Sequence, residues 1–486
     1  MALLFTMDTI CGVKDMLVID KESKVTLYEQ IYNQLRQQII SGVIPANSLL
    51  PSTRNLAKEL QVSRNTVESA YLQLYSEGYI SSKACSGYKV EKIESDLLRE
   101  FGPISVERTI QPLQEMNEQG VSHIKEIAFQ YGRLRTSDFP ARLFRRIINQ
   151  ILLSSDMDLI SAYNNRKGEL DLRIEIMKYL YESRGVRCKP EQIIICSGMS
   201  VCIGLLSQLL MRHTNDIAVE DPCYDTVRLT FKNHGFHIVP VQVEKDGINL
   251  VDLSHSSAKA VYVTPSHQFP TGVVLPVNKR LSLIEWADRN NAYIIEDDYD
   301  SELRYNSRPI PSMQSLDSKG CVVYINTFSK SFAPGLRLSF MVLPMTLLEE
   351  YQIRFNKYNC TVPWLEQKVM YEFMKEGHWN RHLRKVCFSN KKRHDILIST
   401  ITELMGNCVK IHGKNAGLHI ILEVHNGLTE SELIEKADAV GVKVYPVSCY
   451  YANVHEDTNN RVLIGFGSLS AEDIVSGIHL LKSAWF

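Results

Sequence analysis

The sequence predicts a multidomain chain in which a small N-terminal α+β unit of helices and a hairpin precedes a much larger α/β unit. Three observations support this prediction. The 486 residues are enough for two or more domains with a sizeable core. Helical spacing and then short alternating segments occupy residues 24–93, whereas apolar strands alternate with helices beyond residue 127. Between them, polar residues with scattered Pro and Gly predict a linker over residues 94–126.

The composition excludes several classes of protein. A hydrophobic content of 44% and a charged content of 22% are ordinary for a soluble chain, and a net charge of −1 gives no overall attraction to nucleic acid. The eleven cysteines include no C-x-x-C pair, which argues for reduced thiols and against a disulfide framework or a zinc ribbon. The first residues lack the basic segment of a signal peptide, and apolar runs such as 202–211 are too short to span a membrane. We therefore expect a cytoplasmic protein without membrane contact.

The N-terminal unit begins with a predicted short strand at residues 14–20, followed by a helix. Thr26 and Glu29 form a capping box, in which a hydroxyl and a carboxylate satisfy the free N–H groups of a helix start. Apolar residues at helical spacing follow, and Gly42 can close the helix in a left-handed conformation.

Two further helices and two strands complete this unit. The second helix begins near Ser52, and a tight turn leads to a third helix that Ser63 caps and Gly78 ends. Residues 79–82 and 88–93 alternate as two short strands. Helix, helix, tight turn, helix and hairpin together predict a winged helix-turn-helix.

The start of the third helix is the predicted DNA-reading element. In a helix-turn-helix the first turn of this helix enters the major groove, where Arg binds guanine edges and Asn binds adenine edges. The start of the second helix can hold a phosphate, and the wing can touch the backbone or the minor groove. The alternative is a capped helical bundle with solvated charges. The residues predicted to contact double-stranded DNA are Ser52, Arg54, Ser63, Arg64, Asn65, Thr66, Lys83 and Tyr88.

The large unit, residues 127–486, alternates apolar strands with helices. This pattern predicts a mostly parallel sheet covered on both faces. The large domain is expected to extend to about residue 365, with a smaller C-terminal α+β domain over about 366–486. The predicted strands are 192–196, 217–220, 237–241, 260–264, 292–296 and 322–326.

Four placements in this unit match the needs of pyridoxal 5′-phosphate (PLP). Residues 193–200 give a strand, a tight glycine turn and a helix start, which suits a phosphate. Tyr224 can stack on a flat ring. Asp297 ends a strand, where its carboxylate can keep a pyridine nitrogen protonated, and Lys330 follows the next strand and can condense with an aldehyde.

Further side chains complete the predicted cofactor site, although other interpretations stay open. Asp297 and Asp298 could form a metal pair or a solvated loop, and His234 with His237 could bind a metal or lie at the surface. In the PLP interpretation, the phosphate contacts are Gly198, Met199, Ser200, Thr327, Ser329 and Arg337, and Tyr299 reaches the ring hydroxyl.

Two parts of the chain resemble known families. Residues 49–80, from Leu-Leu-Pro-Ser-Thr-Arg onward, resemble the GntR-type winged helix. The order strand, Asp297, strand, Lys330, Arg337 resembles fold-type I aminotransferases. With both parts in one chain, the sequence resembles the MocR-type subfamily of GntR transcriptional regulators over nearly its whole length.

Two more segments carry the resemblance to aminotransferases. One is Thr-Pro-Ser-His-Gln-Phe-Pro-Thr-Gly at 264–272, and the other covers residues 162–173 with its Tyr, Gly and Leu-Arg. The match spans roughly residues 127–486 and implies a PLP-dependent transferase fold of type I.

The resemblance to the MocR-type subfamily has functional implications. It implies a head-to-tail homodimer and a regulator that senses PLP or an amino-compound effector through an aldimine at Lys330. It also implies that Tyr163 reaches the cofactor phosphate of the neighbouring subunit, that His267 belongs to the cofactor site, and that Arg461 binds an effector carboxylate. A bidentate guanidinium suits a carboxylate, and the alternative for Arg461 is an exposed strand-edge arginine.

Two positions depart from the family pattern. Phe269 stands where aminotransferases usually carry an Asn that contacts the ring hydroxyl, so turnover is expected to be weak, although this residue pattern does occur in the regulator subfamily. In the member that responds to γ-aminobutyrate, an arginine lies two residues beyond the stacking tyrosine. Here that position is Thr226, with Arg228 two residues further on, which argues against γ-aminobutyrate as the effector.

Three functions remain open on the sequence alone. The first is a transcriptional regulator that responds to PLP or to an amino compound. The second is an aminotransferase with an auxiliary DNA-binding domain, because Lys330, Asp297 and Arg461 would suffice for slow turnover. The third is a repressor whose large domain only dimerises, which the retained cofactor residues oppose.

Overall fold

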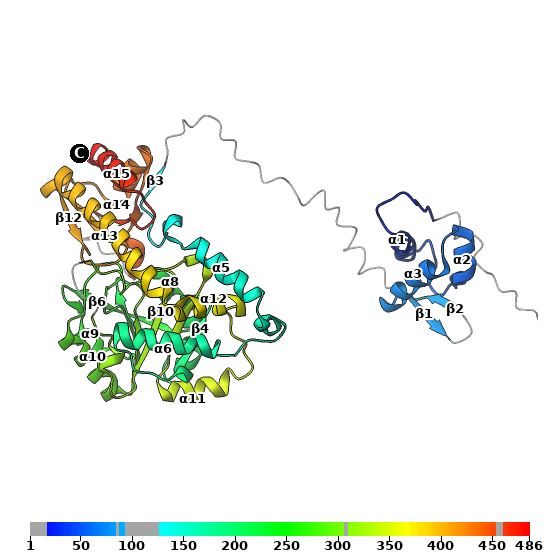
Figure 1. The fold of residues 1–486 in the computed structure, drawn as a ribbon, viewed down its shortest axis with the longest axis horizontal. Coiled ribbons are helices and arrows are strands. Elements are labelled where there is room, and N and C mark those ends of the chain that lie inside the picture. Colours follow the sequence, from blue (N-terminus) through cyan, green and yellow to red (C-terminus); the bar gives the residue numbers. More distant parts are fainter. Residues whose placement is uncertain (1–16, 84–86, 93–125, 306–309, 453–459) are drawn as a thin grey trace, which may run out of the picture. The chain divides into compact units, whose positions relative to one another are not determined.

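The computed structural model describes residues 17–83, 87–92, 126–305, 310–452 and 460–486 (Figure 1). The chain divides into two compact units, residues 1–121 and 122–486, which are described separately below. The predicted linker, 94–126, lies outside the described residues except for Glu126.

The N-terminal unit is a winged helix-turn-helix, as its sequence pattern predicts. Three helices and a two-stranded hairpin surround one apolar core, in which Ile31, Leu56, Val67 and Leu74 are fully buried. Its elements are α1 (Leu27–Ile40), α2 (Thr53–Leu60), α3 (Arg64–Ser76), β1 (Ile80–Lys83) and β2 (Gly87–Val90).

Local contacts explain the helix boundaries. The Thr26 backbone N–H and hydroxyl both donate to Glu29 Oε2, at 3.2 and 2.8 Å, which fixes the start of α1. Gln61 ends α2 in the left-handed region with a φ of 51°, so the tight turn into α3 does not need a glycine. The predicted strand at 14–20 is wrong over its described part, because Val18 pairs its N–H and C=O with the Gln34 side chain instead of with another strand.

The large unit is built on an eight-stranded mixed sheet. The strand order is β4-β11-β10-β9-β8-β5-β6-β7, in which β11 is antiparallel to both of its neighbours and β7 is antiparallel to β6. All six predicted strands are confirmed. The strands are β4 (Ile193–Cys196), β5 (Asp216–Asp221), β6 (His237–Glu244), β7 (Gly247–Ile248), β8 (Ala260–Val263), β9 (Tyr293–Asp297), β10 (Val322–Thr327) and β11 (Ser339–Val342).

Helices cover both faces of this sheet (Figure 1). Alternate strand residues point to opposite faces, so Ile194 packs in one apolar core with α7, α8 and α11, and Ile193 packs in another with α5, α6 and α12. The helices are α5 (Ala141–Leu152), α6 (Leu170–Arg184), α7 (Met199–Leu210), α8 (Asp225–Asn233), α9 (Leu250–His255), α10 (Val277–Asn290), α11 (Met345–Arg354) and α12 (Trp364–Lys375).

A smaller C-terminal domain has a four-stranded sheet of its own, in the order β12-β13-β16-β15. Trp379, at the start of the next helix, still packs with α12 in the core of the large domain, whereas Leu397 and Ile401 of that helix pack in the C-terminal core, so the change of core falls within α13. The elements are α13 (His378–Met405), β12 (Val409–His412), β13 (His419–Val424), α14 (Glu430–Ala439), β14 (Val442–Lys443), β15 (Tyr445–Pro446), β16 (Arg461–Gly465) and α15 (Ala471–Trp485).

The first strand of this unit, β3 (Ile127–Ala128), belongs to the C-terminal domain. It pairs in parallel with β14, with Ile127 opposite Val442. Phe129 follows it and is fully buried in the C-terminal core. The chain therefore enters the unit through its last domain before it builds the large sheet.

Candidate functional site

The ends of several parallel strands meet at one edge of the large sheet and form a pocket there. Asp297 is the last residue of β9 and Thr327 the last of β10, and α7 starts three residues after β4. Parallel strands place their carboxyl ends at a common edge, where α/β folds bind ligands. The pocket is lined by Tyr131, Met199, Ser200, Tyr224, Thr226, Tyr262, Thr264, Phe269, Asp297, Tyr299, Thr327, Ser329, Lys330 and Arg337.

Lys330 lies at the centre of this pocket. Its Nζ is 4.0 Å from the ring centroid of Tyr131. Burial lowers the pKa of Lys330 to about 8, against the opposing charges of Asp300 and Asp297. A buried lysine with a lowered pKa has a larger neutral fraction near pH 7, and only the neutral amine is a nucleophile.

Asp297 presents one unsatisfied carboxylate oxygen. Its Oδ2 accepts a hydrogen bond from the Tyr262 hydroxyl, whereas its buried Oδ1 has no partner. Burial raises the pKa of Asp297 to about 7, against the lowering effect of the Tyr262 hydrogen bond. A buried acceptor without a donor is costly, so Oδ1 fits a ligand N–H such as that of a protonated pyridine.

The opposite end of the pocket suits a phosphate. Gly198 precedes α7, and a Cβ at this position would lie 2.2 Å from the Arg337 guanidinium, so only glycine lets the two approach. Met199 and Ser200 form the first turn of α7, whose free N–H groups favour an anion. Among the described residues the Arg337 side chain makes no hydrogen bond or ion pair, so its charge is free for an anion.

Several predicted phosphate and ring contacts are already engaged with protein. The Thr327 hydroxyl donates to Ser329 Oγ at 2.9 Å and accepts from Ser339 at 2.8 Å. The Tyr299 hydroxyl donates to the backbone carbonyl of His267 at 2.9 Å, which leaves only its lone pairs for a ring hydroxyl. Tyr224 borders the pocket with its ring 5.5 Å from that of Phe269.

His267 is not among the residues that line the pocket, and its assignment to the cofactor site stays a prediction. It is buried behind Tyr299, with Nδ1 2.8 Å from Asp300 Oδ2 and 3.2 Å from the Tyr299 hydroxyl.

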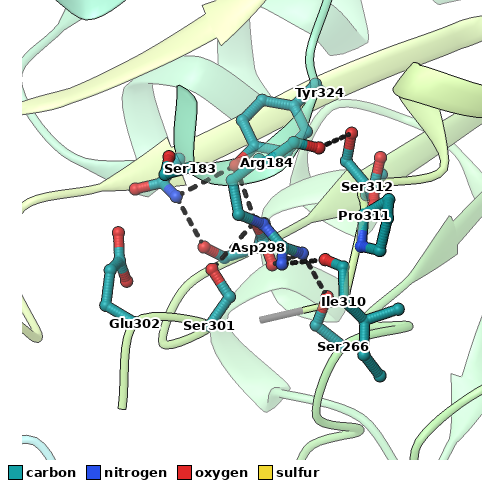
Figure 2. Close-up of polar contacts among 12 residues, drawn as sticks. Ser183, Arg184, Ser266, Asp298, Ser301, Glu302, Ile310, Pro311, Ser312 and Tyr324 are labelled. Carbon is teal, nitrogen blue, oxygen red and sulfur yellow. Dashed lines mark hydrogen bonds and ion pairs between the residues drawn. The ribbon is translucent and has the colours of Figure 1, made fainter. Parts of the chain in front are cut away.

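A buried ion pair fixes the strand end that carries Asp297 (Figure 2). Arg184, at the end of α6, donates from Nε and Nη2 to the Asp298 carboxylate at 2.7 and 3.0 Å. The hydroxyls of Tyr324 and Ser301 donate to the same carboxylate at 2.6 and 3.0 Å. Although burial opposes it, the charge of Arg184 holds the pKa of Asp298 below its usual value.

Arg184 also ties together loops around the pocket. Its Nη2 donates to Ser266 at 2.7 Å, and its Nη1 donates to the Ile310 carbonyl (Figure 2). The Asn326 amide donates to the Asp298 backbone carbonyl at 2.8 Å. Asp298 is thus a structural ion-pair partner that anchors Asp297, and not half of a metal pair.

Arg461 is not among the residues that line the pocket, and its assignment as a carboxylate ligand stays a prediction. Its Nε and Nη2 lie 3.0 and 2.9 Å from Glu423 Oε2 on the neighbouring strand. His412 and His425 also bond this carboxylate. Although burial opposes it, these hydrogen bonds and the charge of Arg461 lower the pKa of Glu423 to about 2. Leu463, on the same strand β16, is buried and packs with the pocket residues Phe269 and Tyr299.

Two other predicted positions have clear surroundings. Tyr163 is 89% exposed, as a residue that contacts another subunit would be in a single chain. Thr226 lines the pocket, but Arg228 donates to the backbone carbonyls of Tyr450 and Cys449 at 2.9 and 3.0 Å. Arg228 is thereby held away from the role of a ligand-binding cation.

In the N-terminal unit the predicted DNA contacts gather at two helix starts. Ser52 accepts from the Asn55 N–H and caps α2, and Ser63 accepts from the Thr66 N–H and caps α3. The predicted residues Ser52, Arg54, Ser63, Arg64 and Asn65 are exposed, and Thr66 is half-buried.

The hairpin residues contribute less to the DNA-binding assignment. Tyr88 packs edge-on against Tyr71, with ring centroids 5.1 Å apart. Lys83 ends β1, and its side chain lies outside the described part of the chain.

Three site residues escaped the sequence analysis. Tyr131 lies over Lys330, Tyr262 bonds Asp297, and Arg184 anchors Asp298. Tyr262 sits on the strand next to β9, so an expected parallel sheet could have suggested it. No local pattern marks the other two, because their partners lie far away in the sequence.

The two units define a class of protein: a winged helix-turn-helix joined to a fold-type I aminotransferase-like unit. Residues 131–462 match the family described as aminotransferase class I and II, and residues 27–90 match the bacterial regulatory proteins of the gntR family. The chain belongs to the MocR-type subfamily of GntR regulators, and its N-terminal unit is a DNA-binding domain.

Similar proteins cover the full length of the chain. The uncharacterized HTH-type transcriptional regulator YdeL of Bacillus subtilis is 38% identical over 96% of this chain and 98% of its own. The probable rhizopine catabolism regulatory protein MocR of Rhizobium meliloti is 30% identical over 97% and 96%. Among solved structures, Pyrococcus horikoshii kynurenine aminotransferase superposes with a TM-score of 0.66 at 25% identity, over 78% of this chain and 97% of its own. Among the described residues, no helix is both long and apolar enough to cross a bilayer.

Proposed function

We propose that this protein is a DNA-binding transcriptional regulator that holds PLP at Lys330 and responds to PLP or to an amino compound. The observation that carries the proposal is the buried, unpartnered Oδ1 of Asp297 in the same pocket as Lys330. A domain kept only for dimerisation would have no use for an unsatisfied carboxylate and a buried amine.

The residues of the pocket divide the task of holding the cofactor. When bound, PLP supplies an aldehyde that reacts reversibly with primary amines. Asp297 Oδ1 would accept the pyridine N–H, Tyr224 would lie against the ring, and Arg337 with the start of α7 would hold the phosphate. Lys330 would supply the amine that attaches the cofactor to the chain.

A homodimer is part of the proposal. Apolar side chains gather at the end of α5 and beyond it, where Leu153, Leu159 and Ile160 are 88%, 51% and 48% exposed, close in sequence to the exposed Tyr163. Exposed apolar side chains of this kind mark protein interfaces. A second copy of the chain would cover them and bring Tyr163 to the partner's pocket. A regulator that binds chromosomal DNA would act in the cytoplasm.

The test combines absorption spectroscopy with DNA binding. The purified protein, loaded with PLP, is expected to show a visible absorption band that borohydride fixes to Lys330 and that Lys330→Ala abolishes. Titration with a panel of amino acids and amines should shift the band and change operator affinity. A band that shifts and stays supports a sensor, whereas repeated conversion to the amino form of the cofactor would make the protein an aminotransferase. Absence of any band would contradict the proposal.

Arg64→Ala is expected to abolish specific operator binding without changing cofactor content. Arg64 is the first residue of α3, and its only described ion pair is a weak one to Glu68 at 3.8 Å, so its guanidinium is available for a guanine edge. Loss of a bidentate contact costs about 1–3 kcal/mol per site. Fluorescence anisotropy with an operator fragment and with a scrambled duplex measures the effect. The matched control is Lys58→Ala, on the exposed side of α2. Normal operator affinity in Arg64→Ala would refute the assignment of α3 as the helix that reads the DNA bases.

The rate of PLP loading onto Lys330 is expected to rise with pH and to level off above pH 8. Burial lowers the pKa of Lys330 to about 8, so the neutral amine is already dominant there. An ordinary lysine would level off only near pH 10.4. Stopped-flow absorbance on cofactor-free protein measures the rate, with N-acetyl-lysine amide as the reference amine. A rate that climbs in parallel with the reference would contradict the assigned environment of Lys330.

A further inference from the structure

The segment that covers Lys330 is fixed to the C-terminal domain. The Ile127 and Phe129 N–H groups donate to the carbonyls of Gly441 and Lys443 at 3.0 and 2.9 Å, and the Gly465 N–H donates to the Phe129 carbonyl at 2.8 Å. These three backbone hydrogen bonds hold the chain on both sides, between β14 and β16. Residues 127–129 are therefore part of the C-terminal domain and are expected to move with it.

The same segment ends in direct contact with the lysine. The Tyr131 ring lies 4.0 Å from Lys330 Nζ, and a Cβ on Gly132 would lie 3.0 Å from the same atom. The ring is held at its sides by Phe269 and His419, with centroids 5.0 and 4.9 Å away. Because Tyr131 and Lys330 line the same pocket, any atom joined to Nζ, or an amino group placed beside it, lies next to this ring.

The backbone behind the ring cannot retreat. A Cβ on Gly465 would lie 2.5 Å from the Tyr131 nitrogen, so the two chains already touch. Contact this close in a packed interior transmits a displacement instead of absorbing it. The displaced body would be β3 and the strands bonded to it.

Tyr131 also has a special place in the covalent chain. Five residues before it, the described part of the large unit begins at Glu126, and the chain before that residue leads to the DNA-binding unit. The residue pressed against Lys330 is thus close in sequence to the connection between the two units. Among the described residues, Gly132 shares this position, but it has no side chain with which to touch a ligand.

We propose that Tyr131 is the residue that couples occupation of Lys330 to DNA binding, because a ligand at the lysine presses on its ring and its backbone continues directly from β3. The inference rests on the proposed function, since it requires a ligand at Lys330. It gives Tyr131 a positioning role and not a catalytic one. Coupling between sites requires that the ligand favour one arrangement over the other, and here the difference is the position of this ring.

The experiment measures operator affinity with PLP as the probe, in the full-length protein. In the unsubstituted chain, PLP is expected to change operator affinity by about fivefold or more, within the usual range of allosteric coupling. Tyr131→Ala should still form the visible band at Lys330, but PLP should change its operator affinity by less than about twofold. Tyr131→Leu is the second variant, in case the cavity left by Ala impairs folding. Leu fills most of the space without a flat ring, so this variant should also lose the coupling.

Two controls separate the ring from its surroundings. Tyr131→Phe keeps the ring and should keep the coupling. Tyr450→Ala removes an aromatic side chain that packs against Phe269 at 4.8 Å without contacting Lys330, and it should keep the coupling as well. Full coupling in Tyr131→Ala and Tyr131→Leu, or loss of coupling in Tyr450→Ala, would overturn the inference while leaving the proposed function intact. Absence of any PLP effect in the unsubstituted chain would overturn the inference alone, because the proposed function also allows an amino compound as the effector. Absence of the band would overturn both.

Discussion

Asp298→Asn is expected to lower the free energy of unfolding by about 3–5 kcal/mol at pH 7, the usual cost of breaking a buried ion pair. The Arg184 and Asp298 side chains are 2% and 0% exposed, so the substitution leaves a buried guanidinium without its counter-charge. Urea denaturation of the full-length protein, followed by circular dichroism, measures the change. The matched control is Asp246→Asn, which removes an exposed partner of the half-buried Lys279 and should change stability little.

The pH dependence of this effect has a definite sign. The pKa of Asp298 is lowered in the folded protein, so its stabilising contribution is present above the unfolded value and is lost as pH falls through the folded value. The difference between Asp298→Asn and the unsubstituted chain should therefore shrink in acid. Equal stability of Asp298→Asn and Asp246→Asn at pH 7 would show that the ion pair does not hold the strand end.

Asp297→Asn, one residue earlier, is expected to have the opposite effect on the cofactor-free protein. Burial raises the pKa of Asp297 from its ordinary 3.8 to about 7, so the folded state disfavours the charged carboxylate. The unsubstituted chain loses stability as pH rises from about 4 to about 7 and regains none above that. The free energy of unfolding of Asp297→Asn minus that of the unsubstituted chain, both without cofactor, should therefore be greater at pH 8 than at pH 4, by on the order of 2–4 kcal/mol.

Cofactor reverses this order. Asn cannot supply the negative charge that a protonated pyridine needs, so PLP should bind the variant weakly and should stabilise only the unsubstituted chain. Thermal unfolding at pH 4 and pH 8, with and without PLP, gives all four values. If Asp297→Asn without PLP is less stable than the unsubstituted chain by the same amount at pH 4 and at pH 8, the burial cost assigned to Asp297 is contradicted.

Local sequence patterns were sufficient for much of the fold. The apolar runs before Asp297 and Thr327 predicted strands β9 and β10, and strand ends in a parallel sheet meet at one edge, so the pocket followed from local information. The same reasoning failed at residues 17–20, where the Gln34 side chain, and not a partner strand, satisfies the backbone of Val18. A segment with a strand-like sequence forms a strand only where another strand can pair with it.

Contacts between distant residues could not be predicted in this way. Arg461 has the residue type that a carboxylate needs, but the pairing of β13 with β16 places Glu423 opposite it. The pairing of Ile127 with Val442 brings Tyr131 over Lys330, and nothing near Tyr131 in the sequence announces it. Register between strands that do not follow one another in the sequence is a property of the whole fold.

The position of β3 determines where the protein can be divided. The aminotransferase match begins at residue 131, and a fragment started there would lack β3 and the fully buried Phe129. A Cβ on Gly477 of α15 would lie 2.7 Å from the Phe129 ring, so this ring fills a close-fitting slot in the C-terminal core. Emptying such a slot costs about 3–5 kcal/mol. A fragment of the large unit made for calorimetry or crystallisation must therefore begin before residue 127, although the aminotransferase match begins only at residue 131.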